Sequence, residues 1–384
     1  MRFPGFEGEW EVKKLVDVAK IIGGGTPDTN IEEYWNGNIQ WFTPSEIKSS
    51  FVTKSNRTIT ELGLKRSSAK LLPKGTILLT TRATIGEVAI ANEQCSTNQG
   101  FQSLIVNDTT NNIFISNWIK HNKNEFIKRA NGSTFSEISR SEIEDIEVFI
   151  PSINEQEKIA SLLSLIDERI QTQSKIIEQL ETLIKGLSEK LFSQKLRLRG
   201  FTQEWTTKSG DEIFTNISNK NHDSDLPILA VTQEYGAIPR NLIDYNVTVT
   251  EESVSGYKVV EKGDFIISLR SFQGGIEYSE YDGICSPAYV ILRPVIPVDR
   301  TFYKYYLKTG SYIINLNKRL EGIRDGKMIS YKYFSEILLP FPSHKEQTAI
   351  AKFLSSIDGK RRMEKSLLDG YQSQKRYLLQ NLFI

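Results

Sequence analysis

The chain has 384 residues, enough for two or more domains with cores of their own, and its 39% hydrophobic and 25% charged residues are ordinary for a globular protein. No stretch approaches the roughly 18 apolar residues of a membrane span, and residues 1–5 lack the apolar run of a signal peptide, so we expect a cytosolic protein. The formal net charge is only +1, whereas a protein that binds nucleic acid without a partner usually carries an excess of basic residues. Any contact with nucleic acid must then come from local patches or be shared with a partner.

The first 150 residues predict an α+β domain. Residues 74–82 form a turn and a strand pattern, and residues 85–90 continue it as a second strand, with a hairpin between them. Residues 114–129 have helical periodicity and lead into a polar stretch that contains Gly132. Residues 146–150 form a last strand pattern. Strands, a helix, a loop and a final strand are typical of the α+β class.

A long helix is predicted next. Pro151 ends the last strand, and Ser152 with Glu155 has the spacing of a capping box. From residue 155 to residue 192 the helix would be roughly 57 Å long at about 1.5 Å per residue. A heptad seam with one polar position follows it: Ile159, Leu163, Ile166, Ile170, Gln173, Ile177, Leu180, Ile184, Leu187 and Leu191.

The second half repeats this order. Residues 262–270 and 273–278 match the first strand pair, and the arginine again falls seven residues after the glycine. Residues 301–320 have helical periodicity. A second helix then follows Pro342, with Ser343 and Glu346 at capping-box spacing. Its seam is less apolar than the first: Ile350, Leu354, Ile357, Arg361, Glu364, Leu368, Tyr371, Lys375, Leu378 and Leu382.

An internal repeat accounts for this order. Residues 151–160 return as residues 342–351, and Gly5-Phe6 with Glu9-Trp10 returns as Gly200-Phe201 with Glu204-Trp205. The period is far longer than a solenoid repeat, so the unit is a domain plus a helix. We expect the two helices to pair as an antiparallel coiled coil, because the two copies are then related by a local pseudo-twofold axis. The connections of about 150 residues allow either direction of pairing, and coiled-coil pairing elsewhere is the alternative.

Catalytic patterns are absent from the sequence. It contains neither a Gly-x-x-x-x-Gly-Lys-Ser/Thr phosphate loop nor a Gly-x-Ser-x-Gly elbow. Ser286-Pro287-Ala288-Tyr289 lacks the second proline of the amino-methyltransferase site. The three histidines are too scattered to suggest a metal site, and Cys95 and Cys285 are interpreted as small core residues.

Two similar domains with different surfaces, held apart by helices, suit a DNA target with two different half-sites. The turns after the matching strands are the first candidates for contact with DNA, because arginine and glutamine read base edges. Ordinary solvated loops are the alternative for every candidate. The candidates are Thr81, Arg82 and Thr84; Arg270, Ser271 and Gln273; the loop residues Ser133, Thr134, Arg324 and Lys327; and the basic residues Lys65, Arg66 and Lys70.

The order of these motifs resembles the specificity subunit of type I restriction–modification systems over essentially the whole chain. The residues that carry the resemblance are Glu155-Gln156, Glu346-Gln347, the Arg82…Gly86 hairpin with Thr97-Asn98-Gln99-Gly100-Phe101, Tyr34-Trp35…Trp41, and Thr43-Pro44-Ser45. The second domain departs from the pattern, because Ser286-Pro287-Ala288 stands where the first domain has Thr97-Asn98-Gln99.

The resemblance implies two target-recognition domains, residues 1–151 and 196–342, and two conserved helical regions, residues 152–195 and 343–384. It implies recognition of a split double-stranded DNA sequence with a nonspecific spacer. It also implies two methyltransferase subunits that use S-adenosylmethionine, and restriction subunits that use ATP with Mg²⁺. The chain itself would hold no cofactor and perform no catalysis. The rival interpretations are a coiled-coil adaptor without sequence-selective DNA binding and a DNA methyltransferase.

Overall fold

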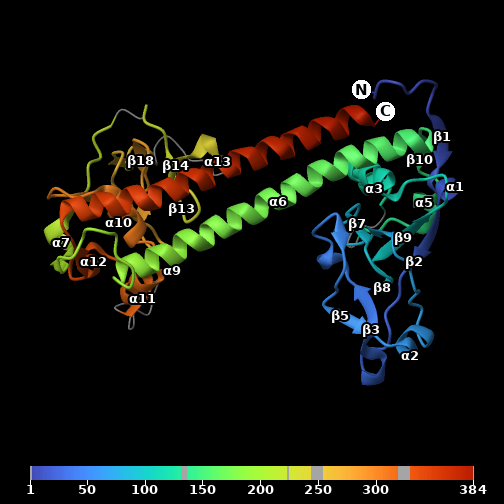
Figure 1. Cartoon of the computed structure of the whole chain (residues 1–384), viewed down its shortest axis with the longest axis horizontal. Coiled ribbons are helices and arrows are strands. Elements are labelled where there is room, and N and C mark those ends of the chain that lie inside the picture. Colours follow the sequence, from blue (N-terminus) through green and yellow to red (C-terminus); the bar gives the residue numbers. More distant parts are fainter. Residues whose placement is uncertain (1, 131–135, 223–224, 244–253, 319–328, 384) are drawn as a thin grey trace. The chain divides into compact units, whose positions relative to one another are not determined.

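The computed structural model describes residues 2–130, 136–222, 225–243, 254–318 and 329–383. The chain divides into two compact units (Figure 1): unit 1 comprises residues 1–174 and 366–384, and unit 2 comprises residues 175–365. Both units mix helices and strands, as the α+β prediction requires. Within the described residues, no helix has both the length and the apolarity needed to cross a bilayer.

Unit 1 is built on a five-stranded sheet with the strand order β2-β9-β6-β7-β4. Only the β4–β7 pair is parallel. A three-stranded sheet, β5-β3-β8, and a two-stranded ladder, β1–β10, complete the unit. The strands are β1 (Glu11–Lys14), β2 (Ala19–Gly23), β3 (Trp35–Phe42), β4 (Phe51–Val52), β5 (Arg57–Ile59), β6 (Ile77–Thr80), β7 (Val88–Ala91), β8 (Cys95–Thr97), β9 (Phe101–Val106) and β10 (Glu147–Ile150).

Unit 2 has a four-stranded antiparallel sheet with the order β12-β19-β16-β17. Three two-stranded ladders, β11–β20, β13–β14 and β15–β18, surround it. The strands are β11 (Thr206–Ser209), β12 (Phe214–Ile217), β13 (Leu229–Thr232), β14 (Gly236–Pro239), β15 (Lys258–Val260), β16 (Phe265–Ile267), β17 (Glu277–Tyr278), β18 (Gly283–Cys285), β19 (Val290–Pro294) and β20 (Leu338–Phe341).

The two central sheets share one strand register. Ile77 pairs with Leu104 in unit 1, and Phe265 pairs with Leu292 in unit 2, so the same pairing recurs with an equal shift in sequence on both strands. Likewise β2-β9-β6-β7 corresponds to β12-β19-β16-β17, and β1–β10 corresponds to β11–β20. The sheet β5-β3-β8 has no counterpart of the same order in the described part of unit 2. The repeat therefore consists of a common strand frame, which is the sheet β2-β9-β6-β7 with the ladder β1–β10 in unit 1 and their counterparts in unit 2. Each copy adds different strands to this frame.

The helical stretches of the two domains are each broken once. The pattern over residues 114–129 forms α3 (Asn112–His121) and α4 (Lys123–Lys128), and the pattern over residues 301–320 forms α10 (Arg300–Tyr306) and α11 (Gly310–Lys318). The remaining short helices are α1 (Leu15–Val18), α2 (Glu61–Lys65), α5 (Arg140–Glu144), α7 (Gly210–Ile213), α9 (Ser271–Gly274) and α12 (Tyr331–Ser335), with 3₁₀ turns η1 (Glu32–Tyr34), η2 (Pro44–Glu46) and η3 (Arg240–Leu242).

The two long helices are α6 (Ile153–Phe192) and α13 (His344–Leu382), and they run antiparallel in each unit. In unit 1, Asp167 of α6 is ion-paired with Lys375 of α13. In unit 2, Glu181 of α6 is ion-paired with Arg361 of α13, at 3.5 Å. The second pair lies farther along α6 and equally far back along α13, by two heptads on each helix. One antiparallel register therefore serves both units, and the predicted pairing is confirmed.

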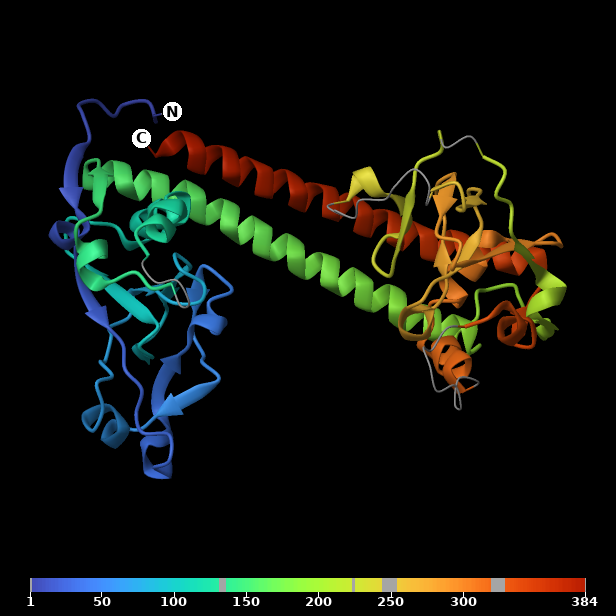
Figure 2. The ribbon, with the colours of Figure 1, turned by 180° about the vertical axis from the view of Figure 1, so that it is seen from behind.

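The seam residues take the positions that the heptad pattern predicts. Every one of the twenty predicted seam positions is buried or half-buried. The start of each helix and the end of the other share one core. The start of α6 and the end of α13 lie side by side in Figure 2, and Ile159, Leu163 and Ile166 share a core cluster with Leu382 and Phe383 in unit 1. In unit 2, the corresponding cluster contains Leu191, Phe192, Ile350, Ala351 and Leu354.

Candidate nucleic-acid interface

The connection between β6 and β7, residues 81–87, is a hairpin loop between antiparallel strands, as predicted. Arg82 and Thr84 are exposed at its tip. Ala83 between them has φ 60°, a left-handed conformation that is uncommon for residues other than glycine. Arg82 Nε is ion-paired with Glu137 at 2.8 Å, which fixes the direction of the guanidinium. Thr81 is a correction, because its side chain is fully buried and does not reach the surface.

The matching connection in unit 2 contains the one-turn helix α9 instead of a simple hairpin turn. Arg270 and Gln273 are exposed there, so two of the three predicted residues face solvent. Ser271 is a second correction, since it is only 1% exposed. Its hydroxyl accepts a hydrogen bond from the Ser268 backbone N–H at 2.9 Å and so stabilises the start of the turn.

The predicted basic residues of unit 1 lie at the surface. Lys65 ends α2, and Arg66 and Lys70 follow it; all three side chains are exposed. Thr60 caps α2 by accepting a hydrogen bond from the Gly63 N–H at 3.0 Å. The four loop candidates Ser133, Thr134, Arg324 and Lys327 lie outside the described residues.

Sequence reasoning missed an arginine on β5. The Arg57 guanidinium carbon lies 3.5 Å from the centre of the Trp35 ring and 6.0 Å from that of Trp41. The two indoles are perpendicular, with their centroids 5.1 Å apart. Their N–H groups donate to the backbone oxygens of Asp28 and Gly25. The tryptophans are thus fixed, and Arg57 rests on them while remaining exposed.

The repeated Glu-Gln motif joins each long helix to its own domain. Gln156 accepts a hydrogen bond from the Asn111 N–H at 2.9 Å and donates to the Pro151 carbonyl. Gln347 accepts from the Asp299 N–H at 2.9 Å and donates to the Pro342 carbonyl. Asn111 and Asp299 are the N-caps of α3 and α10. The glutamines therefore connect the starts of two helices in each unit, and both are fully buried.

The predicted capping boxes are only half correct. Ser152 and Ser343 do accept hydrogen bonds from the N–H groups of Glu155 and Glu346. The two carboxylates do not return to those serines. Glu155 binds Arg2 at 2.7 Å, and Glu346 binds Arg197 at 2.7 Å, each through more than one hydrogen bond. The repeated pattern Arg-x-x-Gly-Phe, at Arg2 and at Arg197, is the sequence signal that could have revealed these partners.

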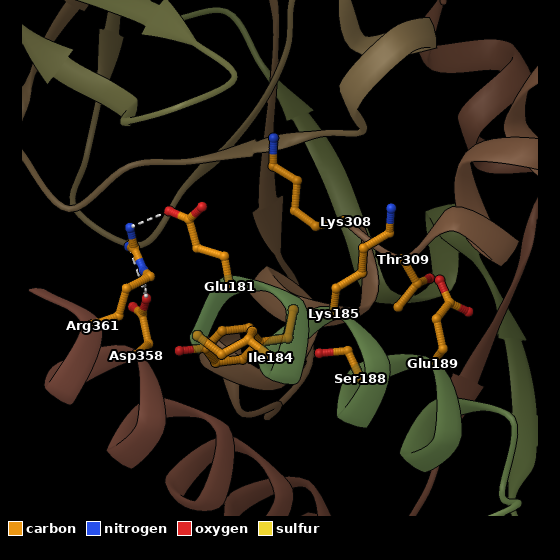
Figure 3. A pocket seen from close by; sticks show the side chains of 10 residues that line it. Glu181, Ile184, Lys185, Ser188, Glu189, Lys308, Thr309, Asp358 and Arg361 are labelled. Atoms are coloured by element: carbon orange, nitrogen blue, oxygen red, sulfur yellow. Dashed lines mark hydrogen bonds and ion pairs between the residues drawn. The ribbon is translucent and has the colours of Figure 1, made fainter. Parts of the chain in front are cut away.

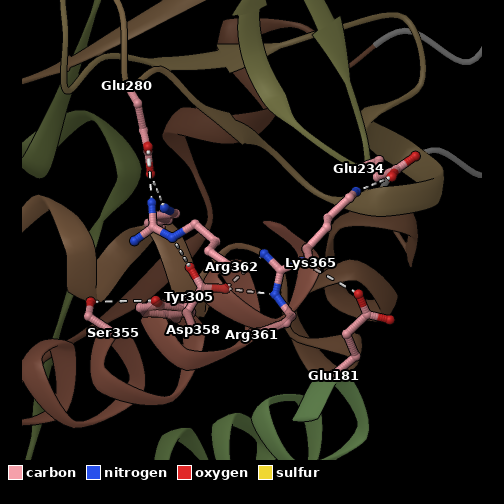
Figure 4. A network of polar contacts seen from close by, with 10 residues as sticks. Glu181, Glu234, Glu280, Tyr305, Ser355, Asp358, Arg361, Arg362 and Lys365 are labelled. Atoms are coloured by element: carbon pink, nitrogen blue, oxygen red, sulfur yellow. Dashed lines mark hydrogen bonds and ion pairs between the residues drawn. The ribbon is translucent and has the colours of Figure 1, made fainter. Parts of the chain in front are cut away.

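The polar residues in the middle of α13 form ion pairs within unit 2. Asp358 is ion-paired with Arg361 and Arg362, and Arg362 reaches Glu280, as Figure 4 shows. Lys365 is ion-paired with Glu234 at 2.9 Å. These pairs connect one helix face to the turn after β13 and to the segment after β17. Arg362 and Lys365, outside the seam, therefore connect α13 to the rest of unit 2, whereas the seam residue Arg361 pairs with Asp358 and with Glu181 of α6.

A hollow of about 320 Å³ lies beside this network, between α6, α13 and the α10–α11 connection (Figure 3). Its lining includes three cations and three acids: Lys185, Lys308, Arg361, Glu181, Glu189 and Asp358. Glu189 accepts a hydrogen bond from the Gly310 N–H at the start of α11. The balanced charge gives this hollow no particular attraction for a phosphate backbone.

Two lysines lie at matching positions of the frame. Lys120 of α3 donates to the Ser50 hydroxyl at 2.8 Å, and Lys308, its counterpart in unit 2, donates to Glu277 and to the Gly274 carbonyl. Burial lowers the pKa of Lys120 to about 8 and also lowers the pKa of Lys308. Burial raises the pKa values of Cys95 and Cys285 to about 12. Both thiols are free, as expected of core residues.

Metal ligands are not gathered anywhere in the described part of the chain, where no three His, Cys, Asp or Glu side chains are placed to share an ion. The described surface instead offers exposed arginine, glutamine and lysine side chains on turns and at a helix end. Such groups form hydrogen bonds to base edges and phosphates, so the arrangement suits binding of nucleic acid.

Comparison with known families gives one match that covers most of the chain. The model of the type I restriction modification DNA specificity domain matches residues 7–182 and, a second time, residues 202–369. Each match includes one copy of the strand frame and much of the long helix that follows it.

Several named specificity subunits are similar to the chain. The type I restriction enzyme MjaIX specificity subunit of Methanocaldococcus jannaschii is 40% identical over 48% of this chain. The EcoR124I/EcoR124II specificity subunit of Escherichia coli is 30% identical over 42% of it. These alignments span less than half of the relatives' own length, 44% and 42%. The putative MjaX specificity subunit of Methanocaldococcus jannaschii is 27% identical, with 91% of this chain and 87% of the relative covered.

Solved structures show the same fold. The S subunit of a type I restriction–modification system from M. genitalium superposes with a TM-score of 0.65 at 20% identity, and covers all of this chain and 97% of its own. A chain from a structural study of type I complex assembly gives a TM-score of 0.57 at 17% identity, with 98% of each chain covered.

Proposed function

The chain belongs to the type I restriction–modification DNA specificity family, and from this membership we propose that it is the sequence-specific DNA-binding subunit of such a system. It recognises a bipartite target, with one half-site for each unit and a nonspecific spacer between them. The observation that carries the proposal is the repeated frame, which has the same strand register in both units but a different set of exposed side chains.

In this proposal, residues 1–151 and 196–342 are the two target-recognition domains, and residues 152–195 and 343–384 are the helical regions between and after them. Relatives of this chain are named as specificity subunits of type I restriction enzymes. We therefore propose methyltransferase and restriction subunits as its partners. The near-neutral charge supports this sharing, because a subunit with a net charge of +1 gains from a partner that supplies part of the DNA clamp.

Arg82 and Thr84 of unit 1 and Arg270 and Gln273 of unit 2 are the proposed DNA contacts, because they occupy matching turns and are exposed. Lys65, Arg66 and Lys70 are proposed phosphate contacts. The loop candidates Ser133, Thr134, Arg324 and Lys327 stay in the proposal on sequence grounds alone. Thr81 and Ser271 are withdrawn because their side chains are buried.

The test uses the assembled methyltransferase complex and a library of DNA targets, with methylation sequenced for each target. We expect Arg82→Ala to weaken one half-site and Arg270→Ala to weaken the other, each by about 1–3 kcal/mol if the arginine binds a base edge. Arg140→Ala is the matched control, because Arg140 is also an exposed, ion-paired arginine of unit 1.

Three outcomes separate the possibilities. Loss confined to one half-site for each arginine supports base recognition. A uniform loss on all sequences assigns the arginine to phosphate contact. A wild-type complex whose methylation shows no bipartite preference, or does not depend on this chain, refutes the proposed function and favours a coiled-coil adaptor.

A further inference from the structure

The Arg57–tryptophan cluster, defined by Arg57, Trp35 and Trp41, is specific to unit 1. Trp205 is the only tryptophan among residues 175–365, and it follows the repeated Gly-Phe pair as Trp10 does, which makes it the counterpart of Trp10. Trp10 packs against Phe114 of α3 and Trp205 packs against Phe302 of α10, each with ring centroids 6.0 Å apart. Unit 2 therefore has no tryptophans equivalent to Trp35 and Trp41. The cluster belongs to the part of the molecule in which the two copies differ.

The cluster lies on the addition to the common frame. Trp35 and Trp41 are on β3 and Arg57 is on β5, and these strands pair with Trp41 opposite Arg57. In Figures 1 and 2, β3, β5 and α2 lie on the side of unit 1 away from α6. Asn36 has φ 61° and the β3–β5 register shifts between Trp35 and Ile39, so an irregular strand start brings both indoles to one site.

The geometry leaves the edge of the guanidinium available. One face of the planar group is covered by the Trp35 ring at 3.5 Å, and this stacking limits the rotamers of the side chain. The in-plane N–H donors are not used by the ring, and the side chain is exposed. Among the described residues, no ion pair of Arg57 is seen, in contrast to Arg82 with Glu137. A stacked arginine whose in-plane N–H groups are free suits a planar ligand that presents two neighbouring hydrogen-bond acceptors.

The surrounding segment is basic although unit 1 as a whole is not. Residues 48–70 contain a single acid, Glu61. The basic side chains in this segment are all exposed: Lys48, Lys54, Arg57, Lys65, Arg66 and Lys70. Cations around a fixed arginine provide the phosphate contacts that set register, while the arginine itself selects a base.

We propose that Arg57 is a specificity-determining residue that reads one guanine, through its N7 and O6 acceptors in the major groove, in the half-site bound by unit 1. This inference rests on the proposed function. It adds a base-reading residue on the segment unique to unit 1, whereas the hairpin arginines lie on the frame that both units share. Lysine retains the charge but lacks the bidentate fork, so exchange to lysine isolates the reading of the base from attraction to phosphate.

The experiment compares wild-type and Arg57→Lys chains, each in its complete methyltransferase complex, on targets in which single guanines are replaced by 7-deazaguanine. In the wild type we expect one guanine of a single half-site at which loss of N7 weakens binding, and at which exchange of the base pair costs about 10- to 100-fold. In Arg57→Lys we expect the 7-deaza effect at that guanine to vanish, while the other half-site is unchanged. Arg140→Lys is the matched control.

Each result decides the question. Non-additive effects of Arg57→Lys and the 7-deaza substitution at one position establish the contact. If the variant lowers binding equally to all targets, or leaves every 7-deaza effect intact, Arg57 does not read a base. If no guanine in either half-site of the wild type is sensitive to loss of N7, the inference fails even if the variant does not fold. A wild type without any bipartite preference would instead refute the proposed function.

Discussion

The pair formed by Arg197 and Glu346 offers a quantitative test of how each recognition domain is attached to its helix. The Glu346 side chain is 3% exposed, whereas the Arg197 side chain is 22% exposed. Arg197 donates three hydrogen bonds to this carboxylate, at 3.2, 2.7 and 2.9 Å. The two single truncations are therefore not equivalent, because one leaves a buried charge and the other leaves a charge that reaches water.

Arg197→Ala leaves the buried carboxylate unpaired, and we expect a cost of about 3 kcal/mol, the lower end for breaking a buried ion pair because the arginine is partly solvated. Glu346→Ala should cost about 1.5 kcal/mol, since the remaining guanidinium can hydrate. The double variant should cost little more than Glu346→Ala alone, which gives a coupling of about 3 kcal/mol. Arg199→Ala, at an exposed neighbour, should stay within about 0.5 kcal/mol.

Native-state hydrogen exchange read by mass spectrometry is the suitable assay, because peptides from residues 344–360 report the start of α13 separately from unit 1. The same set of variants at Arg2 and Glu155 should lower protection at the start of α6. Additive effects of the two unit 2 variants, or a smaller loss for Arg197→Ala than for Glu346→Ala, would show that the pair does not hold the helix start.

Other expected outcomes follow from burial. Leu163→Ala, at a fully buried seam position, should lower the free energy of unfolding in urea by about 3 kcal/mol. Leu165→Ala, at a nearby position that is 57% exposed, should change it by no more than about 0.5 kcal/mol. Equal losses of stability would contradict the assigned seam. The thiols of Cys95 and Cys285, with pKa values raised to about 12 by burial, should react slowly with a thiol reagent at pH 8 and rapidly in urea; fast reaction of the folded chain would show that the cysteines are accessible. Burial, and to a smaller extent the charge of Lys375, lower the pKa of Lys120 from 10.5 to about 8 in the folded chain. Between pH 8 and pH 10 Lys120 is therefore protonated in the unfolded chain but largely deprotonated in the folded chain. The free energy of unfolding of unit 1 should rise with pH over this range. Lys120→Met should abolish that rise in unfolding followed by fluorescence of the four tryptophans of unit 1, and an unchanged pH profile would assign the rise to another group.

Much of the frame could be predicted because its helices follow a periodic spacing of apolar residues and its motifs occur twice in the sequence. The seam from Ile159 to Leu191 follows heptad spacing, and packing confirms it. The repeat at Trp10 and Trp205 and at Gln156 and Gln347 indicated matching positions in two domains, and the strand registers agree with it. When the same local sequence pattern occurs in both domains, each copy supports the structure predicted from the other.

The site was harder to predict because exposure depends on distant parts of the chain. Thr81 follows β6, whose residues are all buried, so no alternation of polar and apolar residues revealed which side chain faces solvent. Arg2 and Glu155 lie far apart in the sequence, and a capping box explained the glutamate equally well from sequence. Arg57 carries no motif, and only the fold brings it over Trp35.

The interleaved cores have a consequence for synthesis of the chain. Unit 2 is one continuous segment, residues 175–365, whereas unit 1 needs residues 366–384, which the ribosome produces after unit 2. Until then the N-terminal core lacks Leu378, Leu382 and Phe383, and Phe114 lacks the ring of Phe383, 5.2 Å away in the finished protein. The unit whose translation begins first is therefore completed second, and a premature stop in α13 would damage the beginning of the protein.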